Sequence, residues 1–236
     1  MHHKISSRNI FHKDYGWHSG YFHFNFGDYI DPANTNFGVL TALNDFSVKP
    51  QNGFQTHAHS EVEIISYCVQ GCLDHIDNIG NASQLYGRDS QYTCTGSGIT
   101  HSEMNNSDSE VLRFIQVWIK PMREALNPLY EFRKHIQTEG DGNVRLIATG
   151  REVSGTSRIA QDANVYAIHL ENGESVVYEN KAGRQTYLYC IEGSAEGNSI
   201  TLQSLDALKM WDAESLWLSA AKHAHLLAVE MARGHQ

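Results

Sequence analysis

Two pairs of side chains in the first half of the sequence have the spacing of a metal site. His57 and His59 are separated by one residue, and His101 and Glu103 repeat that spacing further along the chain. In a β-strand, residues i and i+2 point to the same face, so each pair would project into one interior. Three imidazoles and one carboxylate suit Fe(II), Mn, Co, Ni, Cu or Zn and suit Ca or Mg poorly. The sequence therefore predicts one divalent transition metal, with two open positions if the ion is octahedral.

The other histidines do not share this pattern. The sequence contains 14 histidines, and most histidines in proteins are surface or hydrogen-bonded residues. His223 and His225 form a second HxH pair, but no glycine-rich turn precedes them and no carboxylate follows at the matching distance. We expect no ligand role for that pair, nor for His12, His18, His23, His75, His135, His169 and His235.

Short apolar or alternating runs predict the strands that must position these ligands. Turn dipeptides such as Asn52-Gly53 separate the runs, and this spacing is typical of an all-β sandwich or barrel. Met122–Gln137 has a helix-like composition, but Pro128 favours a broken, extended connector over a continuous helix. The predicted strands are Gly38–Leu43, Val62–Val69, Leu112–Ile119, Asn143–Ala148, Val165–Leu170, Thr186–Ile191 and Leu226–Met231.

A short segment of the first half recurs in the second half. Tyr67–Gly71 (YCVQG) is answered 122 residues later by Tyr189–Gly193 (YCIEG), and each copy ends an apolar strand at a glycine. Each copy is followed by a polar turn and an aspartate, Asp89 or Asp206, that leads into another strand. Together with the strand pattern, the echo predicts two copies of one barrel.

The echo also sets the expected domain organisation. We expect one barrel at residues 1–120, a connector at 121–142 and a second barrel at 143–236. At the spacing of the echo, the first HxH pair corresponds to Glu179-x-Lys181, which is not a ligand pair. The second barrel is therefore expected to bind no metal.

Composition excludes several classes of function. The 236-residue chain is 41% hydrophobic and 19% charged, with a formal charge of −9, which is typical of a globular protein. Without a cluster of Lys or Arg, direct binding of nucleic acid is not expected. Because we find no signal peptide and no stretch of about 18 apolar residues, we expect a cytoplasmic protein that does not enter the membrane. A monomer is the default expectation for its oligomeric state. Buried free thiols are expected at Cys68, Cys72, Cys94 and Cys190.

Several motifs resemble one known family. The sequence is similar to the pirin family of bicupins along nearly its whole length. The cupin elements are His57, His59 and Glu63, followed by Gly98, His101 and Asn105. The pirin-specific elements are DYGW (Asp14–Trp17), FNFGDYIDP (Phe24–Pro32), NFGVLTALND (Asn36–Asp45), GSGITHSE (Gly96–Glu103) and QDA (Gln161–Ala163).

The resemblance implies two jelly-roll β-barrels packed together, with one metal, often iron, in the N-terminal barrel. It implies that the ligands are His57, His59, His101 and Glu103, that Glu63 is not a ligand, and that the C-terminal barrel has lost its ligands. Two departures from the family pattern affect substrate preference and nearby charge. This chain has His57-Ala58-His59-Ser60-Glu61 where relatives often have HPHRG or HPHRD, and Tyr86-Gly87-Arg88-Asp89 where they have RPGD.

The first functional hypothesis is a quercetinase, an oxidoreductase that opens a flavonol ring with dioxygen and releases carbon monoxide. The metal would bind the deprotonated 3-hydroxyl of the flavonol and bring dioxygen close. Glu103 would be the catalytic base that takes the hydroxyl proton when it swings off the metal. Apolar side chains near the ligands would line a pocket, although most are expected to be barrel core. They are Phe54, Tyr67, Tyr92, Phe114 and Trp118.

Two alternatives belong to other classes. Eukaryotic pirins suggest a redox- or metal-sensing protein that regulates a protein partner in transcription. The fold also hosts isomerases and other small-molecule enzymes. Phosphorylated sugars are not expected as substrates, because the nearest cations, Lys49 and Arg113, are expected to be solvated surface charges.

Overall fold

The computed structural model describes residues 1–136, 143–212 and 214–234, and these residues confirm the predicted all-β architecture. Within them there is one short 3-10 helix and no α-helix, and no helix long and apolar enough to cross a membrane. All seven predicted strands are present. The elements are β1 (His2–Ile5), η1 (Ser7–Asn9), β2 (Phe11–Asp14), β3 (His18–Phe22), β4 (Leu40–Val48), β5 (Asn52–His59), β6 (Glu63–Gln70), β7 (Leu73–Asp77), β8 (Ala82–Leu85), β9 (Ser90–Cys94), β10 (Ile99–Asn105), β11 (Leu112–Ile119), β12 (Leu129–Arg133), β13 (Val144–Thr149), β14 (Ser157–Arg158), β15 (Ala163–Leu170), β16 (Ser175–Asn180), β17 (Arg184–Gly197), β18 (Ile200–Gln203), β19 (Ala207–Trp211), β20 (Glu214–Ser219) and β21 (Ala224–Ala232).

The chain forms two compact units, each built from segments that are separated in the sequence. The N-barrel consists of Phe11–Ile136 and Arg151–Gln161. The C-barrel consists of Met1–Ile10, Gln137–Gly150 and Asp162–Gln236. The domain boundaries predicted at residues 120 and 142 stay a prediction.

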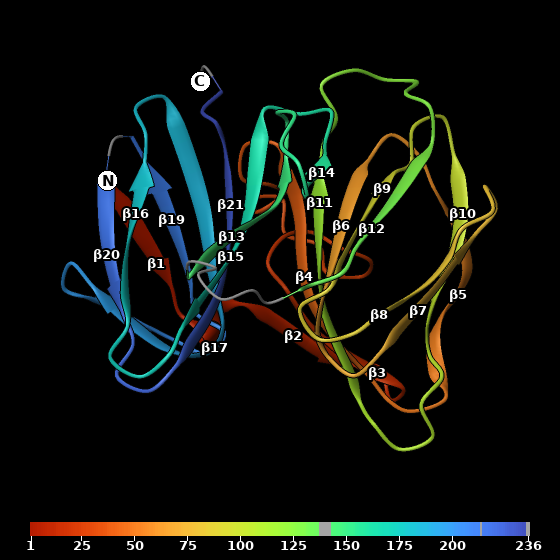
Figure 1. The fold of residues 1–236 in the computed structure, drawn as a ribbon, viewed down its shortest axis with the longest axis horizontal. Helices are drawn as coiled ribbons and strands as arrows, with labels where there is room; N and C mark the ends of the chain where they lie inside the picture. The colour runs from red at the N-terminus through yellow and green to blue at the C-terminus, as the bar shows by residue number, and fades with distance from the viewer. Residues whose placement is uncertain (137–142, 213, 235–236) are drawn as a thin grey trace. The chain divides into compact units, whose positions relative to one another are not determined.

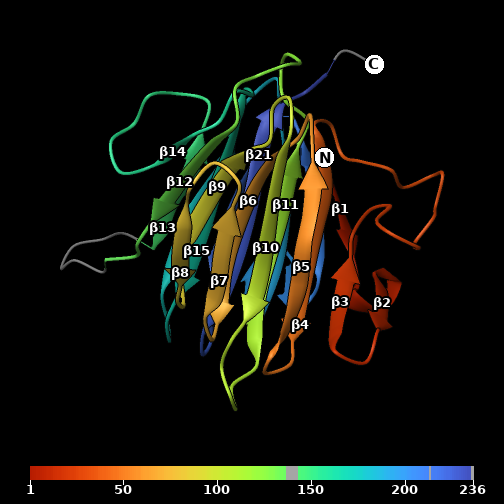
Figure 2. The same ribbon diagram turned by 90° about the vertical axis from the view of Figure 1, so that its right-hand side faces the viewer.

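The N-barrel contains two sheets that enclose its core. One has the strand order β12-β9-β6-β11-β4-β3-β2, and the other has the order β5-β10-β7-β8. In Figure 2 the strands of the second sheet lie next to one another, in front of the first sheet. Phe46, Cys68 and Phe114 from the first sheet pack with Leu73 and Leu85 from the second. Burial alternates strictly along β10, as expected for a strand with one face toward a core, and this alternation turns His101 and Glu103 inward.

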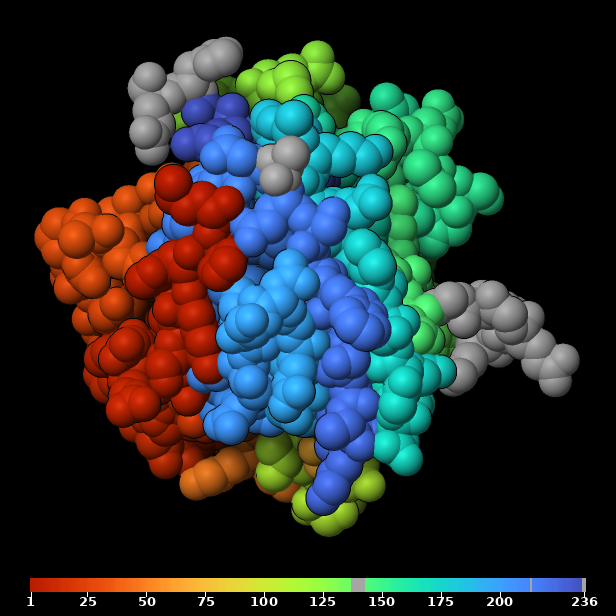
Figure 3. Space-filling model, turned by 90° about the vertical axis from the view of Figure 1, so that its left-hand side faces the viewer, coloured from red at the N-terminus to blue at the C-terminus, as the bar shows by residue number. Residues whose placement is uncertain are grey.

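The C-barrel repeats this plan with other strands. Its main sheet runs β1-β19-β17-β21-β15-β13, while β16 pairs with β20 and β18 pairs with β17 (Figure 1). The N-terminal strand β1 lies along β19, where Figure 3 shows the red N-terminal segment beside the blue strands. Ile168, Leu188, Leu208, Leu216 and Leu226 belong to one buried cluster. The first residues of the chain therefore complete the C-barrel.

The YC-x-x-G echo marks equivalent places in the two barrels. The Cys68 N–H donates a hydrogen bond to the carbonyl of Asp89 at 3.0 Å, and the Cys190 N–H donates to the carbonyl of Asp206 at 2.9 Å. Both cysteines are fully buried on the strand before the glycine turn. The echo is therefore a structural repeat, as the two-barrel prediction requires.

The thiols are free, and three of the four are buried as predicted. Cys68, Cys94 and Cys190 are buried, whereas Cys72 is partly exposed because it follows the turn at Gly71. The prediction of a buried thiol was thus wrong for Cys72 alone.

The segment after Pro121 is extended where the structure describes it. Pro128 directly precedes β12, which pairs with β9 along its whole length. The preference for an extended connector over a helix is confirmed there. Gln137, the rest of the predicted connector at 138–142, and His235 lie outside the described residues.

Candidate metal centre

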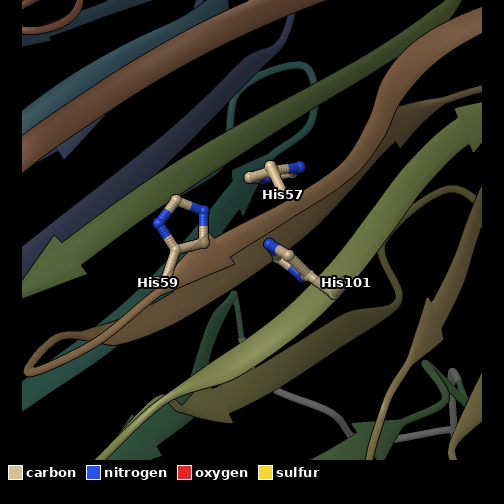
Figure 4. Close-up of side chains that lie close together, drawn as sticks. All are labelled: His57, His59 and His101. Atoms are coloured by element: carbon tan, nitrogen blue, oxygen red, sulfur yellow. The ribbon is translucent and has the colours of Figure 1, made fainter.

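Strands β5 and β10 bring three imidazoles together. In their antiparallel register His57 lies opposite His101, and His59 lies opposite Ile99. The ring centroids are 4.6 Å apart for His57 and His101, 4.7 Å for His57 and His59, and 5.1 Å for His59 and His101. Figure 4 shows the three rings converging, and one potential ligand atom from each lies within 4.8 Å of the others.

A β-bulge separates Glu103 from this group. Between His57 and Phe54 strand β5 advances three residues, while β10 advances only two, from His101 to Glu103. Glu103 consequently lies opposite Phe54 on β5 and opposite His75 on β7. Bulges often occur beside active sites, where they re-aim a side chain.

Glu103 belongs to a second group, which shares His101 with the first. Potential ligand atoms of His75, His101 and Glu103 also lie within 4.8 Å of one another, and all three residues are buried. In the described part of the chain no other group of three such residues meets this condition. The structure thus brings three of the predicted ligands together in one triad and places the fourth, Glu103, in a second triad that shares His101. The complete ligand set stays a prediction.

His75 was not expected to take part. The sequence holds a weak signal for it, because His75 and Asp77 have the same i, i+2 spacing as His101 and Glu103. The Nε2 of His75 lies 3.3 Å from Asp77, and its ring stacks on Tyr130 with the centroids 4.4 Å apart. A carboxylate that orients an imidazole in this way is common around metals.

The imidazoles of the first triad are suited to bind a cation at neutral pH. Burial, and then the neighbouring His101 and His57, lower the pKa of His59 to about 4. Burial, and then His57 and His75, lower the pKa of His101 to about 3. Both rings are therefore neutral and offer a lone pair. Nδ1 of His57 donates to the carbonyl of Gln55 at 2.7 Å, which leaves its Nε2 as the free acceptor.

His101 provides the test of whether a metal fits. The residue is 1% exposed, and neither ring nitrogen has a hydrogen-bond partner among the described residues. A buried polar atom without a partner costs about 1–3 kcal/mol, so native structures rarely tolerate one. A metal ion on this ring would satisfy a nitrogen that the protein leaves unpaired, and the donor set fits a transition metal.

The carboxylate of Glu103 is held firmly. Within the described residues, Oε1 accepts hydrogen bonds from Ser66 Oγ and Gln91 Nε2, both at 3.1 Å, and Oε2 accepts one from Gln116 Nε2 at 2.7 Å. Burial raises the pKa of Glu103, while His75, His57 and these donors oppose that rise. A carboxylate has about four acceptor positions, so Oε2 is the oxygen with one left for a metal or a proton.

Only two of the five predicted pocket aromatics contact the histidines. Trp118 stands edge-on to His59 with the centroids 4.9 Å apart, and Phe54 lies 6.4 Å from His57. The other three, Tyr67, Tyr92 and Phe114, are at most 1% exposed and belong to the barrel core, as expected. A pocket of about 240 Å³ reaches His59, lined also by Ala58, Ser60, Asn78, Gly98, Ile99 and Thr100.

The C-barrel has different residues at the corresponding strands. On β16 the inward-facing residues are Tyr178 and Asn180, while Glu179 is exposed. The predicted correspondence with Glu179-x-Lys181 was therefore out of phase by one residue. On β20, Leu216 lies opposite Tyr178 and Leu218 lies opposite Val176, and both leucines belong to the buried cluster.

In the second HxH pair, His223 precedes strand β21 and only His225 lies on it. His225 lies on β21, where the bulge pairs it with Glu192 just as β11 pairs Arg113 with Gln70. It therefore corresponds to Arg113 and not to a predicted ligand. Arg113 itself was expected to be solvated, but its guanidinium is paired with the buried Asp45 at 2.6 Å.

Comparison with known proteins agrees with this architecture. The Pirin family model matches residues 4–119, and the model of the quercetinase C-terminal cupin domain matches residues 146–231. A pirin-like protein of Caulobacter vibrioides is 33% identical over 93% of this chain and 94% of its own length. The chain belongs to the pirin family. This pirin-family chain is thus a bicupin, as the sequence predicted.

Two relatives from Escherichia coli connect the family to a reaction and to a metal. The quercetin 2,3-dioxygenase of strain K12 is 29% identical over 93% of this chain and 94% of its own length. The structure of the bacterial pirin YhhW in complex with nickel(II) has a TM-score of 0.90 and 28% identity, and covers 99% of this chain and 100% of that one. These findings support metal binding by the family and leave open the identity of the metal here.

Proposed function

We propose that this pirin-family protein is a metal-dependent quercetin 2,3-dioxygenase. The observation that carries the proposal is the triad of imidazoles, which converge beside a pocket that reaches His59. The name of the Escherichia coli relative supports the same reaction class. The resident ion in this proposal is Fe(II), with His57, His59, His101 and Glu103 as its ligands.

Each residue has a distinct task in the proposed reaction. The three histidines would hold the ion beside the pocket that reaches His59. When bound, the ion supplies Lewis acidity and brings the flavonol oxygen and dioxygen close together. Oε2 of Glu103 would take the proton of the flavonol 3-hydroxyl after this carboxylate has left the ion, because Oε2 is the oxygen that keeps an acceptor position. Burial favours this role by raising the pKa of Glu103.

The overall reaction needs no further reductant. One flavonol and one dioxygen molecule give the ring-opened ester and one carbon monoxide, so both oxygen atoms are accounted for in the products. Trp118 and Phe54 supply flat apolar surfaces near the ligands, which suit an aromatic substrate.

The test combines metal analysis with turnover. Freshly purified protein is analysed for bound metal, then stripped and reloaded separately with Fe(II), Ni(II), Mn(II), Co(II), Cu(II) and Zn(II). We expect loss of quercetin absorbance with release of carbon monoxide in air and none under nitrogen. His101→Ala removes the residue common to both triads and should abolish this turnover. His225→Ala, on the C-barrel, is the matched control and should retain it. Carbon monoxide at the level of the metal-free protein for every ion would overturn the proposal.

We also propose that the enzyme is a cytoplasmic monomer that contacts neither nucleic acid nor membrane directly. Light scattering on the eluted protein should give the mass of one chain, 26.5 kDa. Twice that mass would contradict the monomer.

A further inference from the structure

A chain of two hydrogen bonds connects the half-buried indole of Trp118 with the buried carboxylate of Glu103. The indole Nε1 of Trp118 donates to Oε1 of Gln116 at 2.9 Å. Nε2 of Gln116 then donates to Oε2 of Glu103 at 2.7 Å. Strand β11 supplies both side chains, since positions i and i+2 share one face.

The direction of this chain is fixed by chemistry. An indole N–H can only donate, and an ionised carboxylate can only accept. The amide of Gln116 between them therefore has a single orientation that satisfies both partners, with oxygen toward Trp118 and nitrogen toward Glu103. Without the indole N–H, the amide loses one of the two contacts that select this orientation.

The two ends of the chain lie in different surroundings. Glu103 is 2% exposed, and Gln116 is 4% exposed. Trp118 is half-buried, stands edge-on to His59, and packs against Phe26 with the centroids 5.1 Å apart. The indole is thus positioned to transmit a change near His59 to a carboxylate that solvent does not reach.

We propose that Trp118 is a positioning residue, which acts through the amide of Gln116 to hold Glu103 as a metal ligand. This inference rests on the proposed metal site. Partners that orient a ligand typically contribute about 10–100-fold to metal affinity. Trp118→Phe keeps an aromatic ring on the His59 side and removes the N–H together with part of the indole. We expect it to weaken binding of Ni(II) and Co(II) by about that factor.

The experiment is a double-mutant cycle on the full chain. Ni(II) and Co(II) affinities are measured by calorimetric titration for the unmodified protein, Trp118→Phe, Gln116→Met and the double variant. Because Trp118 acts through Gln116, the double variant should bind no more weakly than Gln116→Met alone. The visible absorption bands of bound Co(II) should shift in the same direction in all three variants. Matched controls are Trp217→Phe and Gln84→Met, at exposed positions on β20 and β8, which should leave affinity unchanged.

The outcomes separate this inference from the function on which it rests. If Trp118 acts independently of Gln116, the losses of the two single variants will add in the double variant, and the proposal is overturned. Unchanged affinity in Trp118→Phe also overturns it, and this variant is the one least prone to misfold because the ring remains. If the unmodified protein binds neither ion, the proposed metal site fails instead.

Discussion

At the scale of single residues, His101 holds the central place in the candidate site. It is the only member common to both triads, and its ring nitrogens have no hydrogen-bond partner among the described residues. By contrast, His57 donates a hydrogen bond to the carbonyl of Gln55, and His75 lies 3.3 Å from Asp77. The ring nitrogens of His101 are therefore the ligand atoms that remain without a partner when the metal is absent.

We therefore predict an order of effects among alanine variants. His101→Ala should lose measurable Ni(II) binding, and His57→Ala should lose more than the roughly 10–100-fold that an outer partner contributes. His75→Ala should fall within that range if His75 only orients Glu103. Calorimetric titration checks the order. Equal losses in His75→Ala and His101→Ala would show that His75 is itself a ligand.

The residue pattern predicted part of this site and missed part of it. His57, His59 and His101 follow from i, i+2 spacing, because that spacing alone fixes which face of a strand a side chain occupies. The position of His75 depends on the register between β7 and β10, which no local pattern encodes. The same limit explains why the predicted correspondence with Glu179 was out of phase by one residue. A constant offset of 122 residues does not preserve the phase of a strand on the other side of a turn.

At the scale of elements, the repeated aspartate ties a distant segment to each barrel. Oδ2 of Asp89 accepts the N–H of Tyr86, and Oδ1 accepts the N–H of His135. In the other copy, Oδ2 of Asp206 accepts the N–H of Gln203, and Oδ1 accepts the N–H of Ser7. One carboxylate in each copy thus closes a turn and anchors an incoming strand or connector.

We predict that Asp206 controls the attachment of β1. Burial alone would raise the pKa of Asp206, but Lys4 and the backbone N–H groups of Gln203 and Ser7 outweigh it and lower the pKa below 3.8. Its contribution to stability is therefore present above pH 3.8 and is lost as the pH falls through the lowered value. Asp206→Asn should cost about 1.5–3 kcal/mol at pH 7. Hydrogen exchange should show β1 opening first, while Asp89→Asn should leave β1 protected.

The glycine that ends each copy of the echo provides a second prediction. Gly71 and Gly193 have φ of 77° and 74°, and an added Cβ would lie 2.7 Å from the carbonyl of Val111 or 2.1 Å from that of His223. Alanine there must displace a backbone as well as adopt a left-handed conformation. Gly173, with φ of 78° and no atom within 4 Å, isolates the conformational cost. In urea unfolding, Gly173→Ala should lose about 1 kcal/mol and the other two clearly more. Equal losses at the three positions would contradict this account.

At the scale of the whole molecule, the two barrels share a plan and differ in what fills it. Polar side chains such as Ser66, Gln91 and Gln116 surround Glu103 inside the N-barrel. In the C-barrel, Leu216 and Leu218 of β20 belong to the buried interior. Strand pattern and the echo sufficed to predict two barrels, because both depend on local sequence. Which segments complete each barrel depends on long-range pairing such as that of β1 with β19.

Metal should therefore stabilise one barrel selectively. Saturating Ni(II) at about 100 times its dissociation constant adds about 2.7 kcal/mol to the state that binds it. In hydrogen exchange followed by mass spectrometry, peptides from β5, β7 and β10 should become more protected. Peptides from β16 and β20 should not change. Protection of β16 and β20 to the same extent would indicate a second ion in the C-barrel.

The difference among the thiols gives the protein a built-in labelling site. Burial raises the pKa of Cys68 and of Cys190 to about 12, so at neutral pH only about one thiol in 10⁵ at either position is the reactive thiolate. Cys94 is also buried, which leaves Cys72 as the accessible sulfur of the four. A maleimide dye should therefore attach at Cys72 without any engineered cysteine. Its emission would follow the N-barrel alone during unfolding or metal loading.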